Sequence, residues 1–155
     1  MMADFSAIAI FCDDIRAEKA GTDTIVGVLP DNINVPDMPG IFPRLAVYIR
    51  LHIFDFESAP SIKIKIVDGK GELIYENVPE QMELEKIVKS TSKEKVGFLG
   101  FLSRVTMTPF IVDCDSTFKV YAEVNGIEKL AGALRIDSVK NADTVISTNA
   151  SQQPS

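Results

Sequence analysis

Apolar and polar residues alternate along several short stretches of this 155-residue chain. In the longest of them, residues 44–54, every second position is aliphatic: Leu45, Val47, Ile49, Leu51 and Ile53. Residues 61–68 repeat the pattern with isoleucine and lysine. A period of two is typical of a β-strand with one buried face. We therefore predict strands at both places.

Turn-forming residues connect further stretches of this kind into hairpins. Residues 68–71 (DGKG) and 125–126 (NG) have the composition of tight β-turns, and each lies between two alternating runs. Residues 6–12 and 24–29 are apolar on both faces, with a charged segment between them. We predict that they form a third hairpin, that residues 16–23 are its loop, and that residues 6–12 are an interior strand.

Two segments lack a clear period. Residues 30–43 contain four prolines, and because proline has no backbone N–H to donate, we expect an extended surface connection without strand pairing. Residues 80–95 fit either a strand or about two turns of helix, and we favour a strand. Pro109 interrupts a predicted strand over residues 104–112 and indicates an edge or a bulge there.

About eight short strands, separated by turns and without a long amphipathic helix, predict an all-β fold: a two-sheet antiparallel β-sandwich of about eight strands. A chain of this length can bury one core, so we assign residues 1–137 to a single domain. In residues 138–155 the alternation of apolar and polar positions is absent, and serine, asparagine and glutamine are frequent. We predict a flexible or disordered C-terminal tail there.

The charge balance and the hydropathy pattern exclude several classes of partner. Sixteen basic residues against 22 acidic ones give a net charge of −6, which disfavours nucleic acid because its phosphates are also negative. No apolar run reaches the roughly 18 residues that a membrane span needs, and no basic residue precedes the first apolar stretch as in a signal peptide. We expect a cytoplasmic protein in which Cys12 and Cys114 are free thiols packed in the core.

Acidic residues follow two of the predicted strands, which raises the question of a cation site. If loops after odd-numbered strands share one end of the sandwich, four carboxylates converge, and calcium prefers such oxygen ligands. These candidate metal ligands are Asp13, Asp14, Asp55 and Glu57. The interpretation that we favour is structural: Asp13 or Asp14 accepts backbone N–H groups or pairs with an arginine. We therefore expect no cofactor, with calcium as the alternative.

The sequence contains no pattern typical of an enzyme site. His52 is the single histidine, and no nucleophile-elbow, phosphate-loop or zinc-protease motif is present, so we expect no enzymatic activity. Residues 96–102 (VGFLGFL) either complete the core or form an apolar interaction surface. We predict a binding module that acts on a protein partner or on itself as a homo-oligomer, through Arg16, Glu18, Val96, Phe98, Leu99 and Phe101.

One segment carries a family resemblance. The run AIFCDDIR at residues 9–16, the glutamate two residues later and the spacing from Gly21 to Val28 resemble the start of a family of bacterial proteins, some of them in mobile elements. The proline-rich segment and the strand near Leu45 are also similar. The resemblance implies a bacterial or phage setting and brings no activity, cofactor or site residue with it.

Overall fold

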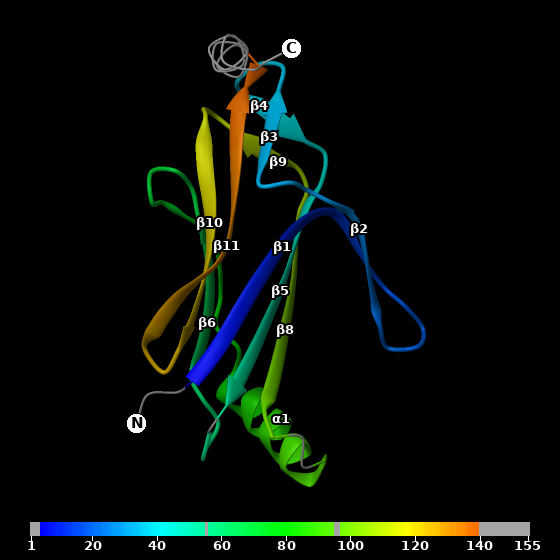
Figure 1. The fold of residues 1–155 in the computed structure, drawn as a ribbon, viewed down its shortest axis with the longest axis vertical. Helices are drawn as coiled ribbons and strands as arrows, with labels where there is room; N and C mark the ends of the chain where they lie inside the picture. Colours follow the sequence, from blue (N-terminus) through cyan, green and yellow to red (C-terminus); the bar gives the residue numbers. More distant parts are fainter. Residues whose placement is uncertain (1–3, 55, 95–96, 140–155) are drawn as a thin grey trace, which may run out of the picture.

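A computed structural model describes residues 4–54, 56–94 and 97–139, with the side chains of residues 91–94 left out. Within these ranges the chain forms eleven strands and one helix (Figure 1). In chain order they are β1 (Asp4–Ala17), β2 (Asp23–Val28), β3 (Asn32–Val35), β4 (Gly40–Phe42), β5 (Leu45–Phe54), β6 (Ile62–Val67), β7 (Leu73–Asn77), α1 (Gln81–Glu94), β8 (Leu99–Met107), β9 (Phe110–Val112), β10 (Ser116–Val124) and β11 (Ile127–Ser138).

The strands form two packed sheets and one small ladder. The first sheet has the order β2–β1–β5–β8, the second has the order β3–β11–β10–β6–β7, and β4 pairs with β9. All pairs are antiparallel except β3 and β11, which run parallel. The predicted all-β sandwich is confirmed, with more strands than the eight expected.

The core lies between the two sheets and follows the alternation read from the sequence. On β5, side chains from Leu45 to Ile53 at every second position are buried, and on β6 the three isoleucines are buried against them. The turn at Asn125 and Gly126 has positive φ at both residues, as a two-residue hairpin requires. The predicted hairpins β1–β2, β6–β7 and β10–β11 are all present.

β1 is longer than its apolar run. It pairs with β5 from Asp4 to Cys12 and with β2 from Cys12 to Ala17. Residues 13–17, which include three charged side chains and precede the turn, therefore belong to the strand. The predicted loop of residues 16–23 is too long, because β1 ends at Ala17 and β2 begins at Asp23. Figure 1 shows the β1–β2 hairpin at the right of the molecule, leaving the body of the sandwich.

The sandwich is closed along one side by a close approach of β1 and β11. A Cβ atom on Gly132 of β11 would lie 2.7 Å from the carbonyl oxygen of Ala9 on β1. Gly132 lies next to a bulge at which the β10–β11 register shifts. Only glycine allows the two backbones to come this close. On the opposite side, the edge strands β7 and β8 belong to different sheets and do not pair with each other among the described residues.

Two predicted segments are corrected. Residues 81–94 form a helix and not a strand, because Leu84, Ile87 and Val88 share one helical face that packs on the core while the exposed residues are mostly charged. Residues 30–43 contain the strands β3 and β4, because their prolines fall before, between and after these short strands. The predicted tail lies, from residue 140 onward, outside the described residues.

Candidate functional site

Among the predicted calcium ligands that the structure describes, Asp13 and Asp14 lie far from Glu57. Cys12 pairs with Ala46, whereas Phe54 pairs with Asp4, so Asp13 and Glu57 belong to opposite ends of the β1–β5 pair. Eight residues of strand separate these ends by about 25 Å. Asp55 lies outside the described residues, and no group of three or more metal-ligating side chains occurs within the described part. The expectation that the loops carrying Asp13 and Glu57 share one end of the sandwich is therefore wrong.

Asp14 has the structural role favoured from the sequence. Its carboxylate lies 3.0 Å from Arg44 Nη1 and 3.8 Å from Arg16 Nε, and it accepts a hydrogen bond from the N–H of Ile15 at 2.9 Å. These contacts hold the start of the hairpin against the start of β5. Exposed pairs of this kind are each worth roughly 0–1 kcal/mol.

The predicted interaction residues are dispersed. Arg16 and Glu18 are exposed near the hairpin turn, where Glu18 accepts a hydrogen bond from the Thr24 hydroxyl at 2.9 Å. Leu99 is fully buried and belongs to the core, which removes it from any contact surface. Phe98 and Phe101 are half-buried, Phe101 packs on the core, and Val96 lies outside the described residues.

The two cysteines differ in environment. Cys12 is buried and donates a weak hydrogen bond to the carbonyl of Ala46, whereas Cys114 is exposed, so the core position predicted for Cys114 is wrong. Burial, and next the charge of Asp13, raise the pKa of the Cys12 thiol. Both cysteines are free thiols.

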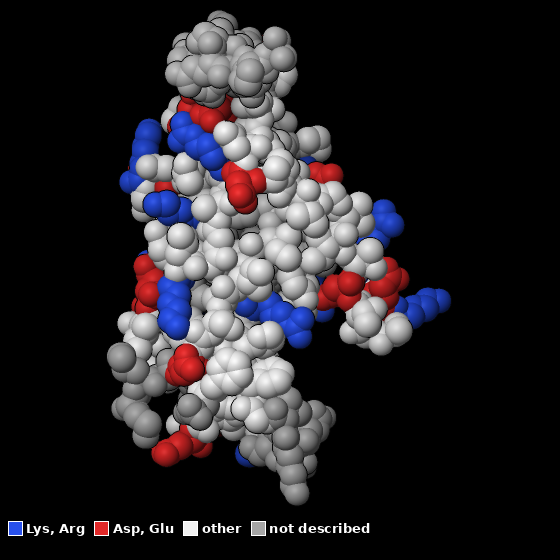
Figure 2. Space-filling model, in the orientation of Figure 1, with Lys and Arg blue, Asp and Glu red and all other residues white. Residues whose placement is uncertain are grey.

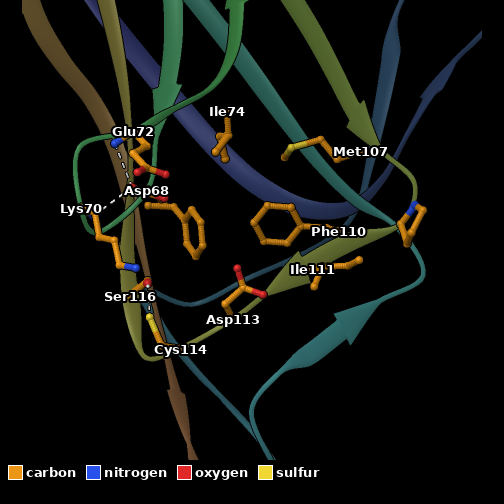
Figure 3. Close-up of a pocket in the computed structure, with 12 residues that line it drawn as sticks. Asp68, Lys70, Glu72, Ile74, Met107, Phe110, Ile111, Asp113, Cys114 and Ser116 are labelled. Carbon is orange, nitrogen blue, oxygen red and sulfur yellow. Dashed lines mark hydrogen bonds between the residues drawn. The ribbon is translucent and has the colours of Figure 1, made fainter.

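A cavity lies at the open side of the sandwich, between the edge strands of the two sheets. It has a volume of about 450 Å³. Ile74 of β7 and Met107 of β8 line it from the two sheets, and Phe110 and Ile111 of β9 line it from the small ladder. We name this cavity the seam pocket. Figure 3 shows Ile74, Met107 and Phe110 converging on it from three different strands.

Aromatic rings make the base of the seam pocket rigid. The rings of Phe110 and Phe118 meet edge to face with centroids 5.0 Å apart, and the rings of Phe42 and Phe110 are tilted with centroids 6.1 Å apart. Both Phe110 and Phe118 are buried. Tilted and edge-to-face pairs of this kind stabilise one another beyond the area that they bury. The base is therefore preformed for an apolar group.

Polar side chains surround the seam pocket. Asp68 accepts hydrogen bonds from the N–H groups of Lys70 and Glu72, both at 2.9 Å, and so fixes the β6–β7 turn that forms one wall (Figure 3). Glu72, Asp113 and the exposed Cys114 complete this rim. With Lys70 as its one cation, the rim carries a net negative charge.

Isoleucine side chains extend from the seam pocket onto the surface. Ile111 is 54% exposed and Ile41, its direct neighbour across the β4–β9 ladder, is 67% exposed. Ile74 on the opposite wall is also exposed. An exposed apolar strip with a polar rim is typical of a surface that contacts another protein. This arrangement is suited to holding an apolar side chain.

A weak signal for this strip is present in the sequence. In the segments 40–42, 73–77 and 110–112, an isoleucine occupies the outward position at which a solvated strand carries a polar residue. Each of these segments alone is too short for the alternation to reveal which face is buried. Only the tertiary structure brings Ile74 and Ile111 to one cavity, with Ile41 beside Ile111 across the β4–β9 ladder.

The face of the molecule in Figure 2 carries charged side chains of both signs. Figure 2 shows basic and acidic side chains interspersed over the visible face, without a broad area of positive charge. No helix in the described part of the chain has the length and hydrophobicity needed to cross a bilayer.

Comparison with known proteins places the chain in a family. A comparison with curated proteins found no match. A family model described as "Family of unknown function (DUF6941)" matches residues 7–120, which is most of the described sandwich: β2 to β9, most of β1 and the first half of β10. The predicted membership of a family without an established activity is thereby confirmed. The chain belongs to DUF6941, a protein family of unknown function.

Proposed function

We propose that this protein is a non-enzymatic binding module that holds an extended segment of a partner protein at the seam pocket. The observation that carries the proposal is the strip formed by Ile41, Ile111 and Ile74, which leads into a preformed aromatic base between two sheet edges. Fully burying one aliphatic side chain of the partner contributes roughly 1.5–3 kcal/mol. Two or three such buried side chains together supply enough free energy for measurable binding.

The edge strand β7 supports an extended conformation of the bound segment. Within the described residues β7 pairs with β6 alone, so its outer edge has backbone N–H and C=O groups free for another strand. Adding a strand to such an edge supplies main-chain hydrogen bonds, and alternate side chains then enter pockets. One side chain of the added strand would enter the seam pocket beside Ile74.

The rim indicates the chemistry of the partner. Glu72 and Asp113 are exposed at the seam pocket, and Lys70 is the single cation there. A segment with a lysine or arginine beside its apolar residues complements this charge. The two free cysteines fit the reducing cytoplasm expected from the sequence.

Selection from a random peptide library displayed on phage, with the purified protein as bait, tests the proposal. We expect enrichment of peptides in which apolar residues alternate and a basic residue flanks them. Binding should fall at least tenfold in Ile111→Asp and persist in the matched control Leu130→Asp, because Leu130 on β11 is 55% exposed and does not line the pocket. Peptides that bind both variants equally well would refute the site.

Self-assembly is tested separately by light scattering over a range of protein concentrations. A dimer that Ile111→Asp dissociates and Leu130→Asp preserves identifies the partner as a second copy of the chain. A dimer unaffected by both substitutions assigns assembly to another surface. A monomer leaves a different protein as the partner.

A further inference from the structure

The seam pocket is too large for an aliphatic side chain to fill. Its volume is about 450 Å³. An apolar cavity of about 150 Å³ already holds one benzene ring. A leucine or isoleucine side chain is smaller than benzene and would leave most of the seam pocket to water. The volume therefore favours a group with more than one ring.

The apolar end of the seam pocket is lined for an aromatic group. Figure 3 shows the thioether of Met107 and the side chain of Ile74 on facing walls, with the Phe110 ring below them. A methionine sulfur makes favourable contacts with aromatic rings. The Phe110 ring already has one edge-to-face partner, Phe118, and such rings stack well with a further ring. These contacts favour a flat ring over a branched aliphatic group.

One carboxylate borders this apolar end. Asp113 directly follows β9, lines the seam pocket and is exposed. Figure 3 shows its carboxylate directed toward the space beside the Phe110 ring. Within the described part of the chain it makes no ion pair or hydrogen bond. A group that fills this space displaces water from the carboxylate, and it loses affinity unless it donates a hydrogen bond in return.

Tryptophan meets both requirements. Its indole group has two fused rings, and its N–H is a donor without acceptor capacity, which suits a carboxylate. Phenylalanine has no donor, and tyrosine has a single ring whose hydroxyl oxygen also presents lone pairs to the carboxylate. Tryptophan is also enriched among the side chains that anchor protein interfaces in pockets.

We propose that the side chain of the partner that enters the seam pocket is a tryptophan, an assignment that rests on the proposed function. Its rings lie against Met107 and Phe110, and its indole N–H donates to the carboxylate of Asp113. The 155 residues of this chain contain no tryptophan. A second copy of them therefore cannot supply the anchor, and the partner is a different protein.

NMR titration of the full chain with N-acetyltryptophanamide tests the anchor, because this neutral probe carries the side chain between two peptide-like groups. We expect saturable shifts of the backbone amides of Ile74, Met107, Phe110 and Asp113. N-acetylleucinamide should bind at least tenfold more weakly. The 1-methyltryptophan derivative, which lacks the indole N–H, should bind about tenfold more weakly. The 5-methyltryptophan derivative carries the same extra methyl group but keeps the N–H, so it should bind more tightly than its 1-methyl isomer.

A pair of variants tests the hydrogen bond to Asp113. Asp113→Ala should abolish the discrimination between N-acetyltryptophanamide and its 1-methyl derivative, because the acceptor is gone. The matched control Asp37→Ala, also exposed but outside the seam pocket, should retain it. Discrimination that survives Asp113→Ala, or equal binding of the two indoles by the parent protein, refutes the assignment.

Two kinds of negative result are distinguishable. If N-acetylleucinamide shifts the same amides and binds as tightly as the indole probe, the anchor is aliphatic, so the tryptophan assignment fails and the proposed function stands. If no probe gives saturable shifts around the seam pocket, both fail. A dimer that Ile111→Asp dissociates would also overturn the assignment, since this chain has no tryptophan to offer.

Discussion

The close approach of β1 and β11 makes Gly132 one of the most informative positions for mutation. In Gly132→Ala the new Cβ atom would lie 2.7 Å from the carbonyl oxygen of Ala9 and 3.0 Å from its Cβ atom. The first distance is roughly 0.7 Å short of the 3.4 Å at which ordinary contact begins. Because the obstacle is backbone and not the end of a flexible side chain, the two strands must move apart.

Overpacking of this kind typically destabilises a protein by about 1–3 kcal/mol. We expect the upper half of that range, because a displacement of β1 also disturbs its pairing with β5. With a urea m-value of about 1–3 kcal/mol per molar, the unfolding midpoint should fall by about 1 M. Urea titration followed by circular dichroism measures this change.

Gly100→Ala is the matched control. Gly100 also lies within a strand, but a Cβ atom there has Phe98 as its nearest neighbour at an ordinary 3.8 Å. This substitution should leave the free energy of unfolding unchanged or raise it by up to about 1 kcal/mol, because alanine restricts the unfolded chain. If the two variants agree within about 0.5 kcal/mol, the close approach does not constrain the fold as argued.

A second substitution tests which atom is the obstacle. Ala9→Gly, added to Gly132→Ala, removes the contact at 3.0 Å and leaves the carbonyl contact at 2.7 Å. It should therefore restore only part of the lost stability. Full recovery would show that the Ala9 side chain, and not its backbone, sets the separation of the strands.

Further predictions concern the helix and the thiols. Leu84→Ala should lower the free energy of unfolding by about 2–5 kcal/mol, since Leu84 is buried in the core. Met82→Ala, on the exposed side of the same helix, should change it by less than about 0.5 kcal/mol. Denaturant titrations measure both changes. Ellman's reagent at pH 8 should modify one thiol per folded chain, that of Cys114, and two after unfolding; two fast thiols in the folded chain would contradict the burial of Cys12. The folded state raises the pKa of the Cys12 thiol. The stability that this shift contributes is complete below the unfolded pKa of about 8.5 and declines as pH rises above it. Between pH 8 and 10 the free energy of unfolding should therefore fall less steeply for Cys12→Ala than for the parent protein.

The two sides of the sandwich differ because the two sheets meet differently there. On one side Gly132 lets β1 and β11 come into backbone contact, and the cavity beside that contact, lined by Ala9 and Ala133 among others, has a volume of only about 170 Å³. On the other side β7 and β8 end their sheets, and the small β4–β9 ladder covers the space between them only in part. The seam pocket therefore results from the way the sheets end and not from one motif in the sequence.

The sequence by itself determined those strands in which apolar and polar residues alternate over enough positions to show the period of two. The inward aliphatic residues of β5 and β6, the Asn125-Gly126 turn and the β6–β7 turn were all predicted, because a period of two and turn chemistry are local properties. The pairing of a carboxylate at the start of the hairpin with an arginine was also predicted, and Asp14 and Arg44 form that pair.

Only the tertiary structure decided the rest. Residues 81–94 carry few apolar side chains, and it is the packing of Leu84 on the core that identifies them as a helix. The strands β3 and β4 are three or four residues long and depend on partners far along the chain, β11 and β9. The seam pocket joins residues separated by tens of positions, such as Ile74 and Met107. Such contacts depend on how the sheets pack, which no local pattern records.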